Sequence, residues 1–503
     1  MAELSPTRAG PGIHQAARVV GTAAAVGLGG QILFSDVGLG LNFPILIAFL
    51  LGAGWVLRRP APGPMRRDLW LAPAAVAFAA FAAVRADTTI VTLDLMTAVA
   101  LTAAALASFG GCSVLARTFG GVMHLGFGAA GWILTGGAPA VSAARSSLPS
   151  ASTALHRARP ALPLLRGMII ATPVVLVFIV LFAAADAVFA RIIEDLWRPD
   201  FDLGDLPGRM ILAAIVGWMA AGALSLAASR LQADVRGSVS FGWRLDHTEA
   251  VTVLVAVNIV FVGFVVLQGA YLFGGLDTMR AIGMTYSDYA RRGFFELVAV
   301  AVLAGGLVVI LEQLTRRRSK LLIGAAVGLV LLTGVVLISA ALRLRLYQDA
   351  YGWTELRLYV LASIGLLGAG LLALAILLWT DRVRWVGHVL VVSALVIGLG
   401  LNVIGPVRFI TEQNVSRLGD RGLTPEGRGT AFDAYYALSL GDDAIPAIVR
   451  ALPSIAEPEA GYIRDALAFR LEELRRAPGL NAWQAWNAGR QAARIALETA
   501  DLD

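Results

Sequence analysis

Apolar stretches of about twenty residues recur from Arg18 to Val403, and short segments that carry arginine separate them. A membrane-spanning helix needs about 20 apolar residues to cross roughly 30 Å of hydrocarbon, and only helices and closed barrels satisfy every backbone polar group there. The strands of a membrane barrel are roughly ten residues long, so runs of this length exclude a barrel. The pattern therefore predicts an all-α protein, a polytopic transmembrane helix bundle.

The positions of the apolar runs predict about eleven spans, which divide into four before residue 137 and seven after residue 164. These spans are Ala17–Phe34, Leu41–Val56, Leu69–Val84, Ile90–Phe109, Leu164–Ala190, Met210–Ala228, Val251–Phe273, Gly293–Leu311, Leu321–Leu342, Leu358–Trp379 and Trp385–Ile404. A further apolar segment, Gly120–Gly137, is rich in glycine and is interrupted by His124. It could span the bilayer, dip into it or lie on its surface.

Changes in composition divide the chain into four parts. Residues 1–137 form a four-span membrane part with the doubtful apolar segment, and residues 138–163, rich in Ala, Ser and Pro, read as a flexible linker. Residues 164–404 form a seven-span membrane part. Residues 405–503 carry more charge and periodic apolar positions, which predicts a small soluble helical-hairpin domain.

Within this C-terminal domain, the apolar positions predict a short helix and two longer amphipathic helices. The short helix is expected over Ala444–Leu452, after a Gly-Asp-Asp break, and the longer ones over Tyr462–Arg475 and Trp483–Leu497. Leu467, Leu471 and Leu474 lie on one apolar stripe of the first long helix.

The arginines predict the orientation of the chain, because short cytoplasmic loops carry the excess of positive charge. The net charge is +6, and Lys320 is the single lysine. With eleven spans, three basic loops fall on the same side, and the segment before the second membrane part joins them if Gly120–Gly137 does not cross. The basic residues of these loops are Arg58, Arg59, Arg66, Arg67, Arg316, Arg317, Arg318, Lys320, Arg382 and Arg384. The rule thus predicts a cytoplasmic N-terminus and an extracytoplasmic C-terminal domain in a bacterial plasma membrane.

Composition narrows the functional classes. Only 15% of the residues are charged, against roughly 25% in soluble domains, and the arginines lie in loops rather than on a soluble basic face, which argues against nucleic-acid binding. One cysteine, Cys112, and five scattered histidines predict neither a disulfide nor a metal site. No strand and no Walker-type lysine accompany the glycine pairs, so no nucleotide or other cofactor is predicted. The first apolar run lacks an A-x-A cleavage site and is interpreted as an uncleaved span.

The candidate chemistry lies in charged side chains inside or beside spans, where an ionised group costs on the order of 2.5–3.5 kcal/mol and requires a partner or a function. The predicted topology places several of them at the outer membrane boundary. One interpretation is that they neutralise one another and hold helices together. The other is an outward-facing pocket for a charged or lipid-head-group ligand. The candidate ligand-binding residues are Arg85, Asp94, Asp186, Tyr286, Tyr289, Arg291, Arg292 and Glu296.

Other polar residues have simpler explanations. Tyr286 and Tyr289 beside arginines also fit an interfacial aromatic belt. Asn258, Gln268 and Asn402 lie within apolar runs, where amides form hydrogen bonds between helices.

Two stretches, Leu181-Phe-Ala-Ala-Ala-Asp-Ala-Val-Phe189 and Thr285-Tyr-Ser-Asp-Tyr-Ala-Arg-Arg-Gly-Phe-Phe-Glu-Leu297, resemble the hallmark sequences of a bacterial membrane-protein family, domain of unknown function 4173, and of its 4153 relative. The similarity extends to Gln268–Gly275, to the Arg85-Ala86-Asp87 turn and to Leu438–Pro446. The resemblance implies a membrane protein but no settled activity.

Three functions remain open at this point. The favoured one is a non-enzymatic integral membrane protein without predicted catalytic residues, whose polar cluster and external domain sense or bind a ligand, such as a lipid head group or an extracytoplasmic protein. A second is an ion- or proton-coupled transporter that uses Asp94, Asp186 and Glu296, although midplane sites in broken helices are not evident. A third is a lipid-linked transferase that uses Asp36 in the first outer loop.

Overall fold

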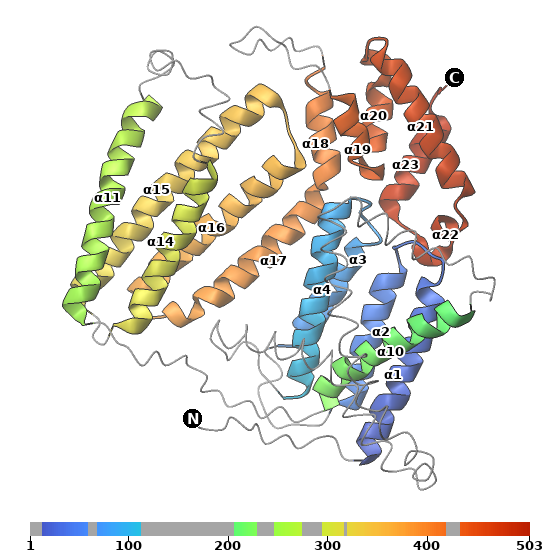
Figure 1. The fold of residues 1–503 in the computed structure, drawn as a ribbon, viewed down its shortest axis with the longest axis horizontal. Coiled ribbons are helices and arrows are strands. Elements are labelled where there is room, and N and C mark those ends of the chain that lie inside the picture. Colours follow the sequence, from blue (N-terminus) through green and yellow to red (C-terminus); the bar gives the residue numbers. More distant parts are fainter. Residues whose placement is uncertain are drawn as a thin grey trace, which may run out of the picture.

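The structure is a computed structural model, and it describes residues 13–58, 68–111, 206–228, 246–273, 294–315, 319–418 and 433–502. Every regular element in these ranges is a helix (Figure 1), which confirms the all-α prediction. The predicted span Leu164–Ala190, the segment Gly120–Gly137 and the linker 138–163 lie outside the described residues.

The first membrane bundle consists of α1 (Ile13–Phe34), α2 (Asn42–Leu57), α3 (Leu71–Phe81), α4 (Thr88–Phe109) and α10 (Leu206–Ala228). Its core includes the fully buried Leu106 and Leu224. Helices α1 and α10 approach closely at Gly27, where an added Cβ atom would overlap the backbone of Ala213 and Gly217. Small residues permit this kind of close helix packing in membranes.

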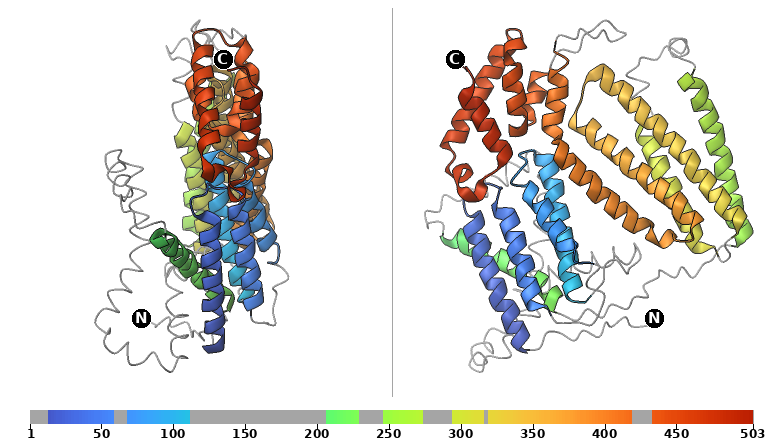
Figure 2. Two further views of the ribbon diagram at one scale, coloured as in Figure 1. Left: turned by 90° about the vertical axis from the view of Figure 1, so that its right-hand side faces the viewer. Right: turned by 180° about the vertical axis from the view of Figure 1, so that it is seen from behind.

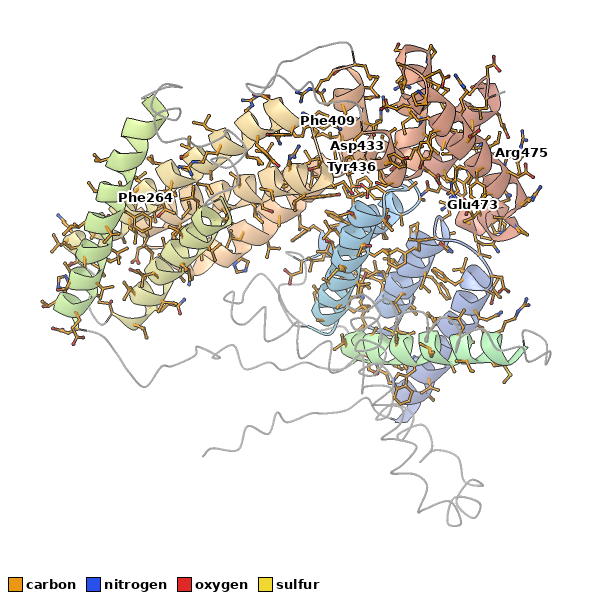
Figure 3. All side chains as sticks on the ribbon, turned by 45° about the horizontal axis from the view of Figure 1, so that its top comes forward. Phe264, Phe409, Asp433, Tyr436, Glu473 and Arg475 are labelled. Carbon is orange, nitrogen blue, oxygen red and sulfur yellow. The ribbon has the colours of Figure 1, made fainter. Side chains whose placement is uncertain are left out.

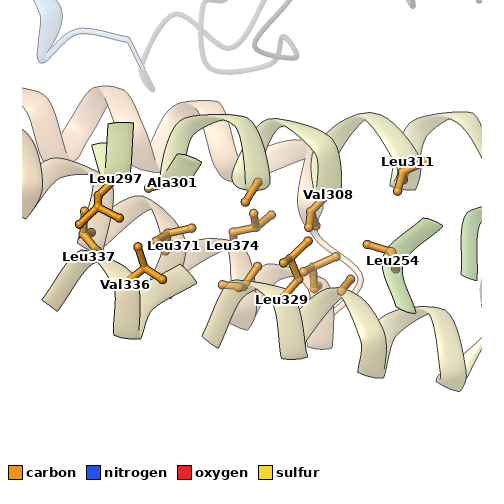
Figure 4. Packing of buried hydrophobic residues seen from close by; sticks show 14 of the residues in the cluster. Leu254, Leu297, Ala301, Val308, Leu311, Leu329, Val336, Leu337, Leu371 and Leu374 are labelled. Carbon is orange, nitrogen blue, oxygen red and sulfur yellow. The ribbon is translucent and has the colours of Figure 1, made fainter. Parts of the chain in front are cut away.

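The second membrane bundle consists of α11 (His247–Phe273), α14 (Phe294–Leu314), α15 (Lys320–Tyr351), α16 (Glu355–Trp379) and α17 (Val386–Ile404). Figure 4 shows its core, in which Leu254, Val308, Leu329 and Leu374 come from four different helices. Within this bundle, Asn258 Nδ2 donates a 2.9 Å hydrogen bond to the carbonyl of Ala325, which confirms that this amide links two helices. The side chain of Gln268 lies outside the described residues.

Large apolar side chains on the outside of both bundles face the surroundings. Leu303 is 71% exposed and Val260 69% exposed, although both belong to continuous apolar helices. Eight of the described helices are long and apolar enough to cross a bilayer. Exposed apolar surface of this extent would be costly in water, so the chain is a multi-pass integral membrane protein.

The predicted span Leu69–Val84 is shorter in the structure, where α3 has 11 residues. Helix α2 has 16 residues, as many as the predicted span Leu41–Val56. At 1.5 Å per residue, α3 rises about 17 Å and cannot cross the hydrocarbon alone. After α3, residues 82–84 form a turn that leads into Arg85-Ala86-Asp87, and Asp87 then caps the first turn of α4.

The C-terminal domain contains α18 (Pro406–Val415), α19 (Ala434–Ser439), a 3-10 turn η3 (Asp442–Ala444), α20 (Ile445–Ala451), a 3-10 turn η4 (Leu452–Ser454), α21 (Glu459–Arg476), α22 (Pro478–Asn481), a 3-10 turn η5 (Trp483–Ala485) and α23 (Ala488–Thr499). Its core includes Ile448, Ile463 and Leu497. The helix predicted over Trp483–Leu497 is present as α23 but begins later, at Ala488, because the chain breaks after η5. Asn487 then starts α23 by accepting a hydrogen bond from the N–H of Arg490.

The two bundles incline away from each other and meet at one end, where the C-terminal domain also lies (Figures 1 and 2). Three loops reach this end. Gly38 of the α1–α2 loop donates to the carbonyl of Gly479 at 3.1 Å, and Trp353 of the α15–α16 loop donates to Asn414 Oδ1 at 2.8 Å. The third loop is the Arg85-Ala86-Asp87 turn.

Side chains of the C-terminal domain, among them Phe409 and Tyr436 (Figure 3), contact the α15–α16 loop and the start of α16. The Tyr436 hydroxyl accepts a 2.8 Å hydrogen bond from the N–H of Glu355, and the ring of Phe409 packs edge-on against Trp353. The C-terminal domain is therefore fastened to both bundles.

Candidate functional site

The short α3–α4 turn organises the candidate site. Asp87 Oδ1 accepts a 2.8 Å hydrogen bond from the N–H of Thr89, so this carboxylate caps α4. An acidic residue is favourable at a helix N-terminus because the first N–H groups have no partner within the helix. The cap fixes the direction in which α4 enters the membrane and leaves Arg85 free to reach the second bundle.

Arg85 joins the turn to the end of α17. Its guanidinium donates hydrogen bonds to the carbonyls of Asn402 and Val403, which are among the last carbonyls of that helix. A positive charge is favourable there because these carbonyls point away from the helix without partners. Gly405 follows in the left-handed region at φ 71°, and an added Cβ at this position would meet the guanidinium.

Inside the membrane, α4 contacts α17 through Asp94 and Asn402. Asn402 Nδ2 donates a 2.8 Å hydrogen bond to Asp94 Oδ1 and a 3.1 Å bond to the carbonyl of Gly398. Asp94 is 2% exposed and Asn402 is fully buried. Asp94 lies about 9 Å along α4 from its first residue. The prediction that Asn402 links helices is thus confirmed, and its partner is one of the predicted site residues.

A third membrane helix contributes Tyr359 of α16, whose hydroxyl faces the Asp87 carboxylate. The hydroxyl oxygen and Asp87 Oδ2 are both buried, and neither makes a hydrogen bond of normal length with the described residues. Burial raises the pKa of Asp87 to about 6, and the charge of nearby Glu355 acts in the same direction. The N–H of Thr89 partly offsets this increase.

The C-terminal domain binds the opposite face of the turn. Asp443 Oδ2 accepts hydrogen bonds from the N–H groups of Ala86 at 2.9 Å and Asp87 at 3.2 Å. Burial raises the pKa of Asp443, an effect that its hydrogen bond with Ala86 and the positive charge of Arg85 oppose. An acidic side chain of the domain thus satisfies two donors that the turn leaves open.

Asn487 completes this attachment. Its Nδ2 donates to the carbonyls of Ala82 at 2.9 Å and Arg85 at 2.7 Å, while the same side chain caps α23. The next two backbone N–H groups, those of Ala488 and Gly489, donate to the carbonyls of Ala83 and Val84. The end of α3 is therefore capped by the start of α23.

We refer to this set of side chains as the polar junction. It comprises Arg85, Asp87, Asp94, Tyr359, Asn402, Asp443 and Asn487, which come from both bundles and from the C-terminal domain.

The structure brings two of the predicted site residues, Arg85 and Asp94, into this junction, where both form hydrogen bonds with Asn402. Five others, namely Asp186, Tyr286, Tyr289, Arg291 and Arg292, lie outside the described residues. Glu296 lies in the first turn of α14, but its side chain is outside the described set. Ligand binding by these residues stays a prediction.

Sequence reasoning missed Tyr359, Asp443 and Asn487. The Gly-Asp-Asp break, which contains Asp443, is recognisable in the sequence. The sequence does not indicate its hydrogen-bond partner, because Ala86 lies 357 residues away from Asp443. Asn487 was hidden within a predicted helix, although asparagine is one of the residues most favoured at a helix start. Tyr359 lies within an apolar run, and no sequence pattern around it indicates that it contacts Asp87.

Two other features lie apart from the junction. A groove of about 540 Å³ between α11 and α15 is lined mainly by apolar side chains, among them Val255, Ile259 and Leu321. Asp36, the residue suggested for transferase chemistry, is exposed and forms an ion pair with Arg209 at 3.4 Å.

The fold and the junction define a multi-pass helical membrane protein whose C-terminal domain is docked on a turn between two membrane helices. The chain belongs to the family described as Domain of unknown function (DUF4153), whose family model matches residues 72–451. The matched segment includes Arg85, Asp94, Asn402 and Asp443 and ends before Asn487. No curated protein and no solved structure matches the chain.

Proposed function

We propose that the protein is a membrane sensor or receptor, in which the polar junction and the C-terminal domain bind a ligand or a partner protein. The observation that carries this proposal is the attachment of Asp443 and Asn487 to the α3–α4 turn. The same turn holds α17 through Arg85, so a molecule that displaces the domain would alter the contact between the two bundles. A sensor needs such a link between an external domain and its membrane helices.

The proposed location is the bacterial plasma membrane, with the N-terminus in the cytoplasm and the C-terminal domain outside. Its support is the arginine-rich loops, which the positive-inside rule assigns to the cytoplasm. The proposed ligand is a lipid head group or an extracytoplasmic protein. We also propose that the chain is related to the family described as domain of unknown function 4173, because residues 181–189 and 285–297 resemble the hallmark sequences of that family. A reporter that is active only outside the cytoplasm, fused after Asp503, should be active, and a cytosolic reporter at that position should be silent.

The sensing proposal is tested in cells that lack the native gene and carry variants of the full chain. We expect Asp443→Ala combined with Asn487→Ala to reach the membrane at the wild-type level but fail to complement the deletion. The matched control is Asn481→Ala, since Asn481 donates to the carbonyls of Leu474 and Ala477 within the C-terminal domain. Full complementation by the double variant, or a loss that follows protein level alone, would refute the proposal.

A second candidate is a proton-coupled transporter, which is favoured by the position of Asp94 inside a span and between the two bundles. In proteoliposomes, an imposed pH gradient should then drive a flux that Asp94→Asn abolishes. If proteoliposomes that contain the wild-type protein show no proton flux under the same gradient, the transporter function is excluded.

A further inference from the structure

The hydrogen bond between Asp94 and Asn402 leaves one oxygen on each side chain without a partner. Asp94 Oδ2 and Asn402 Oδ1 are buried, and neither has a hydrogen-bond partner among the described residues. Both atoms are acceptors, so they cannot satisfy each other as they stand. Buried polar atoms in native proteins nearly always have partners, and two orphans on one hydrogen-bonded pair require an explanation.

A single proton would give both oxygens a partner. We propose that Asp94 holds a proton on Oδ2 at neutral pH and donates it to Asn402 Oδ1, so that the two side chains form a cyclic acid–amide pair. In this pair, Asn402 Nδ2 donates to Asp94 Oδ1, as the 2.8 Å contact shows, and the acid O–H donates in the opposite direction. The proton adds to a carboxylate oxygen from water and returns to water on release, and no other bond changes.

The surroundings favour this neutral pair. From the turn, Arg85 and Asp87 face Asp94, and from α16, Tyr359 and Glu355 face the same group of acids. Asp443 of the C-terminal domain also interacts with the charge of Arg85. Arg85 is thus the one cation that faces Asp94 among the described residues, and its hydrogen bonds go to α17 carbonyls. An ionised Asp94 would place a second negative charge beside Asp87 in a buried site.

The proton has a structural consequence because α4 belongs to the first bundle and α17 to the second. With the proton, two hydrogen bonds join these helices at Asp94 and Asn402. Without it, one bond remains and two unsatisfied oxygens stay buried beside it. The contact between the bundles is therefore weaker when the proton leaves. This inference goes beyond the proposed function and holds whether or not the C-terminal domain binds a ligand.

The test is infrared difference spectroscopy on the full chain in lipid vesicles, read at the C=O stretch of protonated carboxyl groups. We expect a band at pH 7 that shifts in heavy water and disappears in Asp94→Asn. The introduced amide would supply an N–H in place of the acid O–H, so this variant should fold. In the exchange variant Asp94→Asn with Asn402→Asp the acid–amide pair is restored in reverse, and the band should return. In Asn402→Leu it should shift, because its acceptor is lost.

An unchanged band in Asp94→Asn at pH 7 would overturn the proposal, since Asp94 would then be ionised. A carboxylate band that responds to sodium but not to choline at fixed pH would also overturn it, by assigning the two oxygens to a sodium ion. If Asp94→Asn does not fold, the infrared spectrum of Asn402→Leu tests the acid–amide pair instead. A band at the wild-type frequency in that variant contradicts the acid–amide pair, and a shifted band supports it.

Discussion

Asp443 accepts a 2.9 Å hydrogen bond from the backbone N–H of Ala86, although 357 residues separate them along the chain. The bond connects the C-terminal domain to a turn between two membrane helices, and Arg85 on the same turn holds the end of α17. One short turn therefore joins three parts of the molecule.

Replacement of Asp443 distinguishes its acceptor role from its charge. Asp443→Ala leaves the N–H groups of Ala86 and Asp87 unsatisfied and should weaken docking by about 1–3 kcal/mol. Asp443→Asn retains an acceptor oxygen and should cost less than half of this. Amide hydrogen exchange of the full chain in detergent, read at Ala86 and Asp87, measures both effects. Equal exchange in the two variants would show that the charge, and not the acceptor, maintains docking.

Asn487 should contribute at least as much as Asp443 to docking of the C-terminal domain, because it donates to two turn carbonyls and also caps α23. Asn487→Ala should increase exchange at the N–H groups of Ala488 and Gly489, which donate into the end of α3. The expected loss is about 2 kcal/mol, the sum of a cap and a buried hydrogen bond. Asn481→Ala, which removes amide bonds within the C-terminal domain, should leave these two N–H groups protected. Increased exchange in the control as well would assign the effect to general destabilisation.

Within the C-terminal domain, Asp442 and Arg470 form a two-pronged ion pair, with 2.9 Å contacts from both Nε and Nη2. Asp442 is nearly buried, and without Arg470 its one remaining ion-pair partner among the described residues is Arg490 at 3.9 Å, so Arg470→Met should destabilise the domain by up to about 3 kcal/mol. Arg408 and Glu412 form an exposed pair four residues apart on α18, and Arg408→Met should cost less than about 0.5 kcal/mol. Thermal unfolding of the two full-length variants provides the comparison, and equal melting temperatures would contradict it.

Gly405 should resist substitution because its backbone lies in the left-handed region and the Arg85 guanidinium occupies the space beside it. Gly405→Ala should cost about 1–2 kcal/mol or more. Gly400 lies earlier on α17 with open space around it, so Gly400→Ala should be neutral or stabilise by up to about 1 kcal/mol. Both variants are compared by thermal unfolding in detergent. A Gly405→Ala protein as stable as the wild type would exclude backbone strain at this bend.

The attachment of the C-terminal domain should depend on pH. Burial raises the pKa of Asp87 to about 6 and also raises that of Asp443. The folded state therefore holds more protons than the unfolded state between about pH 4 and 6, so the free energy of unfolding falls as pH rises through this window. The change is on the order of 2 kcal/mol and is complete above the raised pKa values.

Melting temperatures at a series of pH values measure this dependence. Asp443→Asn should reduce its slope, and Asn481→Ala, which removes amide hydrogen bonds within the C-terminal domain and no titratable group, should not. A stability that rises from pH 4 to 6 would contradict the sign that burial of these two carboxyl groups requires.

The sequence predicted the membrane helices well because each apolar run carries its own signal. It also predicted that Asn402 forms a hydrogen bond between helices, as its contact with Asp94 confirms. It did not predict that Asn402 and Asp94 bond to each other, since hydropathy specifies depth but not which helices are neighbours. The contacts of Asp443 and Asn487 could not be predicted for a related reason. Their hydrogen-bond partners are backbone groups of a turn, and backbone groups leave no residue-specific pattern in the sequence.

Helix α18 begins at Pro406, with only Gly405 between it and the last membrane helix. Such a short tether keeps Asp443 and Asn487 at a high effective concentration around the turn, so a detached domain would rebind far faster than it could diffuse away. A competing molecule must therefore match an intramolecular interaction rather than a free one. The intact chain should thus be selective for abundant or multivalent competitors, such as a continuous layer of lipid head groups, over scarce soluble ones.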